Sequence, residues 1–343
     1  MNACAPQIAG LLTTYNRACL LPLILDGLLQ QDLPQESYEI VIVNDGSSDQ
    51  TRETLDYYSK SRTNIRVIHQ YHSGLACARN LAVIASRAPL IVFLDDDDIA
   101  SPNLLSAHLA AHKRYPAPNV AILGFTRLDE KIALIPLMHH VTEVGCQLFS
   151  YGRMKPGAML TFREFWGGRS SCKREFLLTH GLFNPAFKFG CEDMELGWRL
   201  HKFGLQVVYE PAAISTMIRA ISFDDFCRRS YRQGLSQAKF YDLHREQEIN
   251  VYCEIDDALS LWPGARIIFK RLVDHVRRLD NYARDGSLPR EGIPCDLTKA
   301  LHDGYRSAFS LFRAKGINDE MARLNVNGNP KPSTHRHCSG RLA

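Results

Sequence analysis

The chain has 343 residues and a formal net charge of +4, which allows one sizeable core with a smaller appendage. So small a charge excess excludes the marked basic patch of a nucleic-acid-binding protein. The ten cysteines form no CxxC pair and no zinc-spaced Cys/His set, so we expect reduced thiols in a reducing compartment. No apolar run approaches the roughly 20 residues of a membrane span, and residues 1–10 lack the pattern of a signal peptide. We therefore expect a cytoplasmic protein whose membrane contact, if any, is peripheral.

Short apolar runs alternate with helical patterns over the first hundred residues. Strands are predicted at 8–12, 38–43, 65–69 and 90–94, with helices between them at 20–29, 51–59 and 75–86. Strands that are apolar on both faces and separated by helices predict βαβ units and a parallel sheet. Right-handed crossovers then bring the loops that follow the strands to one edge, where ligands bind in open α/β sheets.

The rest of the chain is less regular and then turns helical. Strands are predicted at 120–125 and 207–209, the second ending before Pro211, and a helix at 191–202; residues 127–165 show no clear pattern. Helical patterns follow at 223–241, 255–261, 266–282 and 297–315. Residues 221–343 carry 20 Lys/Arg against 16 Asp/Glu, so this part holds the whole charge excess. We divide the chain into an α/β domain (1–220), a helical region (221–324) and a polar tail (325–343) that we expect to be disordered.

Four consecutive aspartates, Asp95 to Asp98, directly follow the predicted strand at 90–94. Adjacent carboxylates repel one another and need a compensating cation or a solvated turn. One interpretation is a hard divalent metal held by carboxylate oxygens and substrate phosphates; the other is a solvated acidic turn before the next helix. A phosphatase with an Asp-x-Asp nucleophile fits less well, because that motif normally follows the first strand and precedes a Thr or Val, where Ile99 stands here.

Two further polar segments follow predicted strands. In the segment at 43–49, Asp49 suits a helix cap, whereas Asp45 is free to accept hydrogen bonds from a base or ribose. In the segment at 72–80, Arg79 lies on the inner face of a helix and needs an anionic partner. We expect that partner to be Asp45, Asp95 or a phosphate.

A third acidic segment opens the predicted helix at 191–202. Glu192, Asp193 and Glu195 all lie in its first turn. Complementarity to the helix dipole accounts for such acids, and best for Glu195. The other interpretation is that one of them is a general base.

In order and spacing, these segments resemble the inverting glycosyltransferases of family 2, which have the GT-A fold. The resemblance runs from Ile8 to about Pro211, through LLTTYNR, VNDGSSD, SGLACARN, FLDDDD, CKREFLLTHGLF and GCEDMELGWRL. It implies an α/β fold with a mostly parallel, Rossmann-like sheet flanked by helices and a C-terminal helical extension. It also divides the first domain into a nucleotide-sugar-binding half (1–100) and an acceptor-binding half (101–220).

The resemblance implies a role for each site residue. Asp97 would ligate Mn²⁺ or Mg²⁺, with Asp96 and Asp98 assisting, and the metal would neutralise the leaving diphosphate. Asp193 would be the general base, with Glu192 as the fallback. Many relatives follow the last strand with a His that approaches the metal. Residues 215–219 contain no His, so metal coordination would rest on the aspartates and phosphates, and Arg219 would help to hold the diphosphate. The remaining residues bind substrates: the donor at Thr14, Tyr15, Asp45, Arg79, Asp95 and Asp96, and the acceptor at Trp166, Gly167 and Gly168.

The implied activity is metal-dependent, inverting transfer of a sugar from a nucleotide diphosphate-sugar, a UDP-sugar by default. The acceptor is a hydroxyl of a glycan, a lipid-linked oligosaccharide or another compound, in surface polysaccharide or glycoconjugate synthesis. A nucleotide-sugar-binding pseudoenzyme that scaffolds a partner is one alternative. A sugar nucleotidyltransferase is another, although its basic, glycine-rich loop is missing after the first predicted strand.

Residues 266–279 form a basic amphipathic pattern in which Ile268, Leu272, Val276 and Leu279 share one face. Such a helix most often packs its apolar face on its own domain, or on a second subunit, which would make the protein a homo-oligomer. The other interpretation is contact with an anionic membrane surface, where a lipid-linked acceptor would lie.

Overall fold

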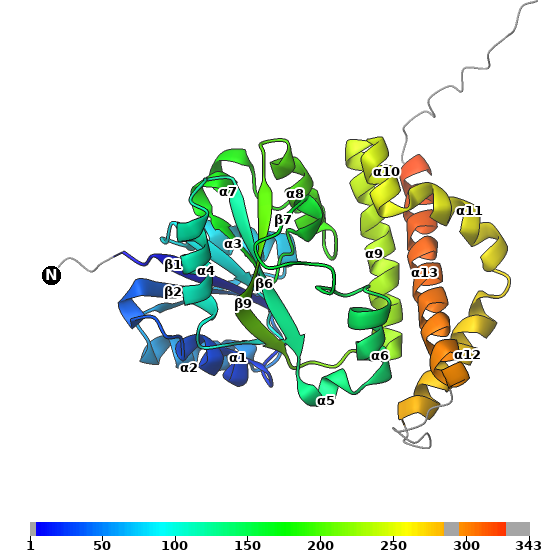
Figure 1. Ribbon diagram of the computed structural model, residues 1–343, viewed down its shortest axis with the longest axis horizontal. Helices are drawn as coiled ribbons and strands as arrows, with labels where there is room; N and C mark the ends of the chain where they lie inside the picture. The colour runs from blue at the N-terminus through cyan, green and yellow to red at the C-terminus, as the bar shows by residue number, and fades with distance from the viewer. Residues whose placement is uncertain (1–4, 285–294, 327–343) are drawn as a thin grey trace, which may run out of the picture.

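The computed structural model describes residues 5–284 and 295–326, in two parts that lie side by side (Figure 1). One part is an α/β structure built on a single sheet, and the other consists of helices. The strands, in chain order, are β1 (Ile8–Thr14), β2 (Tyr38–Asp45), β3 (Ile65–Gln70), β4 (Leu90–Leu94), β5 (Asp98–Ala100), β6 (Val120–Leu128), β7 (Met159–Leu160), β8 (Ser170–Lys173) and β9 (Gln206–Met217).

The helices of the α/β part lie on both faces of the sheet. They are α1 (Leu21–Leu29), α2 (Thr51–Ser61), α3 (Leu75–Ala85), α4 (Leu104–Arg114), α5 (Glu130–Ala133), α6 (Pro136–His139), α7 (Arg174–His180) and α8 (Glu192–His201), with the short turns η1 (Gln35–Ser37), η2 (His140–Val144) and η3 (Phe162–Glu164). One apolar cluster joins α3 and α8 to one face of the sheet, and a second joins α1 and α4 to the other. The short elements α5, α6, η2, β7 and η3 fall in the stretch 127–165, which shows no clear pattern in the sequence.

The first half of the sheet is parallel, in the order β3-β2-β1-β4. Every residue of β1 and β2 is buried, which explains why these strands are continuous apolar runs instead of alternating ones. The predicted strands and helices of this half are confirmed. The strands extend further than predicted, so that Thr14 and Asp45 are the last residues of β1 and β2.

The second half of the sheet mixes directions. β8 lies antiparallel between β4 and β6, while β9 runs parallel to β6 and antiparallel to β5. The prediction that the strand at 207–209 stops before Pro211 is wrong, because β9 continues to Met217. The register shifts between Leu123 and Phe125 of β6, opposite the segment that contains Pro211. A proline, which cannot donate to the ladder, is tolerated at such an irregularity.

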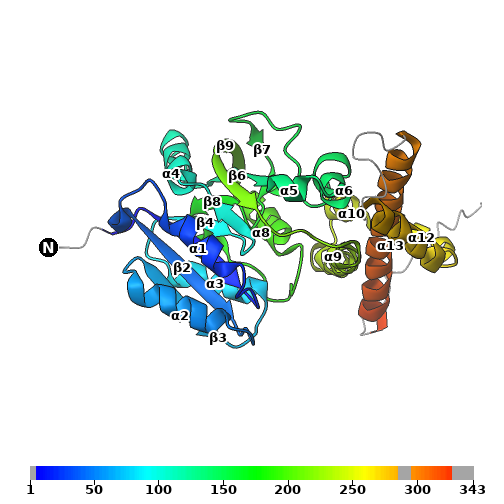
Figure 2. The same cartoon turned by 90° about the horizontal axis from the view of Figure 1, so that it is seen from below.

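The helical part consists of α9 (Phe223–His244), α10 (Gln247–Cys253), α11 (Ile255–Ala265), α12 (Phe269–Arg284) and α13 (Cys295–Val326). Helix α9 begins where the Ser222 hydroxyl accepts the Asp225 N–H (3.1 Å), an N-cap that satisfies a free donor of the first turn. Helix α9 stands between the α/β part and α13, and α11 and α12 lie beyond (Figures 1 and 2). The predicted disordered tail begins too early, because α13 is helical through Val326; residues 327–343 lie outside the described part.

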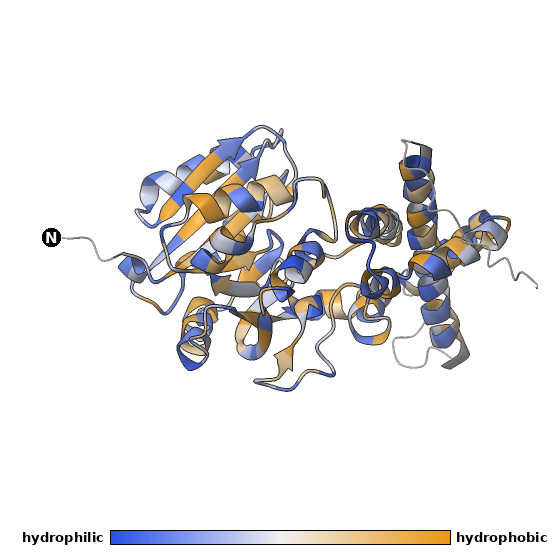
Figure 3. Cartoon of the chain, turned by 90° about the horizontal axis from the view of Figure 1, so that it is seen from above, coloured by the Kyte–Doolittle hydropathy of each residue, from blue (hydrophilic) through white to orange (hydrophobic). Residues whose placement is uncertain are grey.

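Helix α12 packs the apolar face that the sequence predicted. Of the predicted face, Val276 is buried in one cluster with Tyr305 of α13, and Leu272 and Leu279 are partly buried against it. Ile268 lies before the helix and is 56% exposed. Hydrophobic residues gather along the strands and on the inner faces of the helices (Figure 3). In the described ranges, no helix has both the length and the apolar character needed to cross a membrane.

Candidate active site

A cleft of about 1250 Å³ lies between the carboxyl ends of the parallel strands and the helices α9 and α13. With the exception of Asp98, the residues that the resemblance assigned to metal, substrates and catalysis line it: Thr14, Tyr15, Asp45, Arg79, Asp95, Asp96, Asp97, Trp166, Gly167, Gly168, Glu192 and Asp193. These residues come from six different segments of the chain. The fold brings them together because loops that follow parallel strands meet at one edge.

The acids that follow β4 are paired with arginines from several elements. Asp96 Oδ1 lies 3.3 Å from Arg17 Nε, and Asp97 Oδ2 lies 2.7 Å from both Nε and Nη2 of Arg219. Burial, opposed by the nearby Arg17, raises the pKa of Asp96 to about 6. The chain itself thus compensates the charge that the sequence analysis assigned to a cation or a solvated turn.

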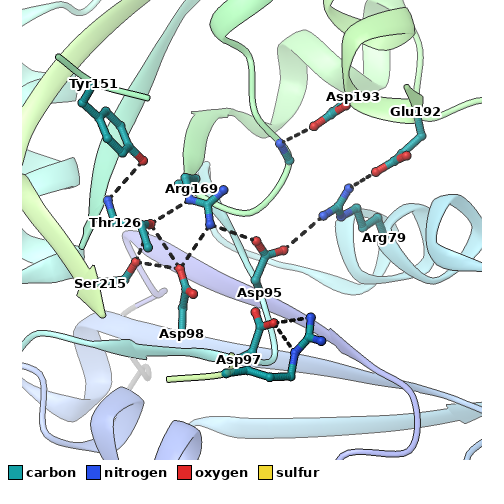
Figure 4. A network of polar contacts seen from close by, with 12 residues as sticks. Arg79, Asp95, Asp97, Asp98, Thr126, Tyr151, Arg169, Glu192, Asp193 and Ser215 are labelled. Atoms are coloured by element: carbon teal, nitrogen blue, oxygen red, sulfur yellow. Dashed lines mark hydrogen bonds and ion pairs between the residues drawn. The ribbon is translucent and has the colours of Figure 1, made fainter. Parts of the chain in front are cut away.

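Asp95 is held more loosely than its neighbours. Its two carboxylate oxygens lie 3.5 Å from Arg79 Nη2 and 3.5 Å from Arg169 Nη2 (Figure 4). Arg169, which the sequence analysis missed, also donates from Nε to Thr126 Oγ1 (2.7 Å). The only local signal for it was a basic residue directly after two glycines.

Asp98 does not assist at the cleft, contrary to the prediction. Its Oδ2 accepts hydrogen bonds from Thr126 Oγ1 (3.1 Å) and Ser215 Oγ (2.9 Å), and lies 3.6 Å from Arg169 Nη2 (Figure 4). Burial raises the pKa of Asp98 to about 7. Asp98 turns inward because β5 starts at this residue and pairs with β9. It therefore contacts Arg169 from the interior of the protein and not from the cleft.

The acids at this edge fit a hard divalent cation that also binds substrate phosphates. Asp97 Oδ1 has no hydrogen-bond partner among the described residues, and the Asp95 contacts are long. No group of three metal-ligating side chains exists in the part of the chain that the structure describes. One or two carboxylates are the usual protein share of a Mg²⁺ site whose other ligands are phosphates and water.

Arg79 of helix α3 contacts the acidic helix α8. Its Nη1 lies 2.8 Å from Glu192 Oε1, in a pair whose side chains are both buried. Burial and the charge of Asp193 raise the pKa of Glu192, and Arg79 opposes them. The expected Asp95 partner is found, but Asp45 is not a partner of Arg79.

Asp45 holds the loop that precedes α3. Its carboxylate accepts the backbone N–H groups of Ser73 (2.8 Å) and Gly74 (2.9 Å) and the Gln70 amide (2.6 Å). His72 Nδ1 lies 3.0 Å away. Beside this loop, the rings of Tyr15 and His72 stack with centroids 4.4 Å apart, and they offer a flat surface at the rim of the cleft.

Asp193 lies on the opposite wall from the aspartate cluster. Its Oδ2 accepts the Gly167 N–H (2.9 Å), so the segment 166–168 fixes the direction of this carboxylate. Cys191, just before it, has a left-handed backbone (φ 62°), a conformation that costs a non-glycine residue about 1–3 kcal/mol. Trp166 lines the cleft but also packs edge-on against Tyr151 (5.4 Å between centroids).

Gly167 and Gly168 lie so close to the side chains of Arg79 and Asp95 that a Cβ at either position would clash. A Cβ at Gly168 would lie 1.9 Å from Asp95 Oδ2, and one at Gly167 would lie 2.4 Å from Arg79 Nη1. Any side chain at these two positions would displace the charged groups of the opposite wall. The glycines therefore bring the segment that orients Asp193 within reach of Asp95.

A mixed α/β sheet with an aspartate cluster after β4 and a facing acidic helix defines this protein as one of the GT-A fold. Residues 11–171, just under half of the chain, match the model described as glycosyl transferase family 2. It is 31% identical over 223 residues to validoxylamine A glucosyltransferase of Streptomyces hygroscopicus subsp. jinggangensis, over 58% of this chain and 52% of that protein. The match thus spans about half the length of this relative.

Solved structures confirm the fold class. A mannosyltransferase from Pyrobaculum calidifontis, crystallised with GDP-mannose and Mn²⁺, superposes with a TM-score of 0.59 at 18% identity, over 92% of this chain and 87% of that one. Residues 1–349 of S. aureus TarS superpose with a TM-score of 0.50 at 17% identity, over 90% of this chain and 91% of that one. Both matches extend through the helical part as well as the sheet.

Proposed function

We propose that this protein transfers a sugar from a nucleotide diphosphate-sugar to a hydroxyl acceptor, with inversion and with the help of Mn²⁺ or Mg²⁺. The observation that carries the proposal is one cleft with Asp95 and Asp97 on one wall and Asp193 on the other. A carboxylate pair beside a leaving diphosphate and a single base across from it are what one displacement requires.

The donor binds along the carboxyl ends of β1, β2 and β4. The stacked Tyr15–His72 pair offers a face for the base, and the loop fixed by Asp45 borders the same surface. The neighbours of known structure were crystallised with GDP-mannose in one case and with UDP in the other. A UDP-sugar is our first candidate.

The diphosphate lies against Asp95, Asp97 and Arg219. A bound Mn²⁺ or Mg²⁺ would neutralise the negative charge that the leaving diphosphate gains. Arg219 is more than one-third exposed in its side chain, so it is free to leave Asp97 and donate to a phosphate oxygen. Arg169 and Arg79 hold Asp95 in place.

Asp193 removes the acceptor proton. As the acceptor oxygen attacks the anomeric carbon, the bond from that carbon to the diphosphate oxygen breaks, the electron pair leaves with the diphosphate, and the proton passes to Asp193. The Gly167 N–H orients this carboxylate. Glu192 is less suited, because Arg79 holds it in a buried pair. One displacement with one base inverts the anomeric centre, unlike the paired carboxylates of glycosidases.

The acceptor enters beside Trp166, whose ring faces the cleft near Asp193. We propose a glycan or lipid-linked hydroxyl as the acceptor, in surface polysaccharide or glycoconjugate synthesis. Relatives in this family include a poly-beta-1,6-N-acetyl-D-glucosamine synthase of Staphylococcus epidermidis, 26% identical over 214 residues.

A donor screen tests the proposal. The full chain is incubated with a panel of nucleotide-sugars and with Mn²⁺, Mg²⁺ or chelator, and released nucleoside diphosphate is measured. We expect release from one donor that stops in excess chelator. A nucleotidyltransferase would instead consume added pyrophosphate and form a nucleoside triphosphate and a sugar 1-phosphate. A non-catalytic binding protein would release nothing from any donor.

A further inference from the structure

The helix wall of the cleft carries a second set of arginines. We use the name helix wall for the cleft-lining residues Arg229, Arg232, Gln233 and Gln237 of α9 and Arg306 and Arg313 of α13. Arg229, Gln233 and Gln237 are spaced four residues apart, so they form one line along α9. This line faces the sheet across the cleft.

Two of these arginines have no carboxylate partner among the described residues. Arg306 is paired with Asp303 (3.0 Å) and Arg313 with Glu254 (2.6 Å). Arg229 and Arg232 instead lie over the ring of Phe189, at 5.2 Å and 4.1 Å from its centroid. One aromatic ring thus presents two guanidinium groups together.

Leaving Arg229 without an anion is energetically unfavourable. Burial lowers its pKa, and this effect exceeds the opposing influence of Glu192, Asp95 and Asp97. A charge withdrawn from water needs a hydrogen-bonded partner of opposite sign. The described residues supply none, so an anionic ligand is the natural partner.

A buried acceptor atom lies on the same line of α9. Gln237 is 6% exposed and lines the cleft, and its Oε1 has no hydrogen-bond partner among the described residues. A buried polar atom without a partner costs about 1–3 kcal/mol. A hydroxyl of a bound ligand would satisfy it.

The geometry points to a subsite on the helix wall for a phosphate-bearing acceptor, with Arg229 and Arg232 on the phosphate and Gln237 on a neighbouring hydroxyl. A phosphate is favoured because its several oxygens accept from two guanidinium forks at once. We assign the subsite to the acceptor because Phe189 lies in the loop that leads to Asp193, the proposed base. This assignment rests on the proposed function, which supplies the acceptor.

A binding experiment tests the subsite without turnover. The full chain, with UDP and Mn²⁺ present to occupy the nucleotide site, is titrated with a glycerol phosphate oligomer and with neutral maltohexaose. In a parallel arm it is sedimented with phosphatidylcholine vesicles, with and without phosphatidylglycerol. Arg229→Gln/Arg232→Gln is compared with Arg228→Gln/Arg245→Gln, which removes two exposed arginines of the same helix region that do not line the cleft.

We expect the oligomer to bind and the neutral sugar not to bind. Affinity should fall about tenfold or more in the cleft variant, because charge-assisted hydrogen bonds are lost, and should stay unchanged in the control. If the protein binds phosphatidylglycerol vesicles but not the oligomer, and the cleft variant loses this binding, the result supports the same subsite with a phosphate carried by a lipid. Equal binding of maltohexaose, equal losses in both variants, or a loss of UDP affinity in the cleft variant would overturn the assignment. Absence of sugar transfer with these binding results intact would count against the proposed function only.

Discussion

The two walls of the cleft differ in whether their charged side chains are paired with side chains of opposite charge. On the sheet wall, Asp95 to Asp98 are matched by Arg17, Arg79, Arg169 and Arg219 at distances of 2.7 to 3.6 Å. On the helix wall, Arg229 and Arg232 rest on an aromatic ring without a carboxylate. The sheet wall is therefore organised before any ligand arrives, while the helix wall retains charge for one. A preorganised wall suits the chemistry, and an unsatisfied wall suits recognition of the acceptor.

A large loss of activity should follow from damage to the sheet wall at Asp97. We expect Asp97→Asn to lower turnover about 10²–10³-fold, the usual cost of losing one preorganised electrostatic partner of the transition state. The fold should persist, because Asp97 lies at the edge of the sheet. Nucleotide release and far-UV circular dichroism measure the two effects. The exposed Glu53→Gln is the matched control, and full activity in Asp97→Asn or in excess chelator would contradict the metal site.

A second change tests how closely the two walls must fit. Gly168→Ala places a Cβ 1.9 Å from Asp95 Oδ2, so the carboxylate or the loop must move. A displacement of about 1 Å in an active site can cost about 10²-fold in rate, and we expect a loss of that order. Gly264→Ala is the control, since its Cβ would meet nothing within 4 Å. Activity equal to wild type in Gly168→Ala would show that the close approach is dispensable.

A third prediction concerns the support behind the sheet wall. His108 and His112 of α4 both contact Ser171 Oγ of β8, at 2.8 and 2.9 Å, and burial lowers the pKa of each to about 3. Below an unfolded-state pKa of about 6.5, the unfolded chain takes up protons that these folded histidines do not. Stability should therefore fall as pH drops from about 6.5 toward 3, by about 1.4 kcal/mol per pH unit for each histidine.

Urea unfolding at several pH values measures this slope. In His112→Gln, the unfolding free energy should depend less steeply on pH, by the contribution of one histidine. This change is expected even if the variant is less stable at every pH. The exposed His275→Gln should leave the slope unchanged. An unaltered slope in His112→Gln would mean that the buried histidines do not govern the acid response.

The smallest effect is expected at α12, the basic helix that packs against α13. Its apolar residues Val273 and Val276 are buried against α13, so this face is not free to enter a membrane. We expect Arg277→Glu/Arg278→Glu to leave sedimentation with anionic and neutral vesicles unchanged. A salt-sensitive loss of pelleting in this variant would show peripheral membrane contact through α12 and contradict the packed-helix interpretation.

The regular half of the molecule could be predicted from the sequence, because each strand there is a local apolar run and most site residues lie at the end of a strand or just after it. The less regular half could not. The end of β9 depends on a bulge opposite Pro211, which only strand pairing decides. The segment 127–165 folds into single turns with no periodicity to detect.

Candidate site residues were found by position, but of their partners only Asp95 for Arg79 was predicted. Arg79 meets Glu192, 113 positions away, and Arg169 meets Asp95 and Asp98 across the sheet. Asp98 looked like its three neighbours in the sequence, yet the start of β5 turns it inward. Such long-range pairings depend on the assembled fold, so no local pattern could indicate them.

The central claim is a single displacement with Asp193 as the base, and NMR of donor turnover tests it most directly. The sugar transferred to the acceptor, or to water in its absence, is observed before its anomers equilibrate, for wild type and Asp193→Asn. The account predicts an inverted anomeric centre and a loss of about 10²–10⁴-fold in rate for the variant, with donor affinity nearly unchanged. Retention of the anomeric configuration, or an undiminished rate in Asp193→Asn, would contradict it.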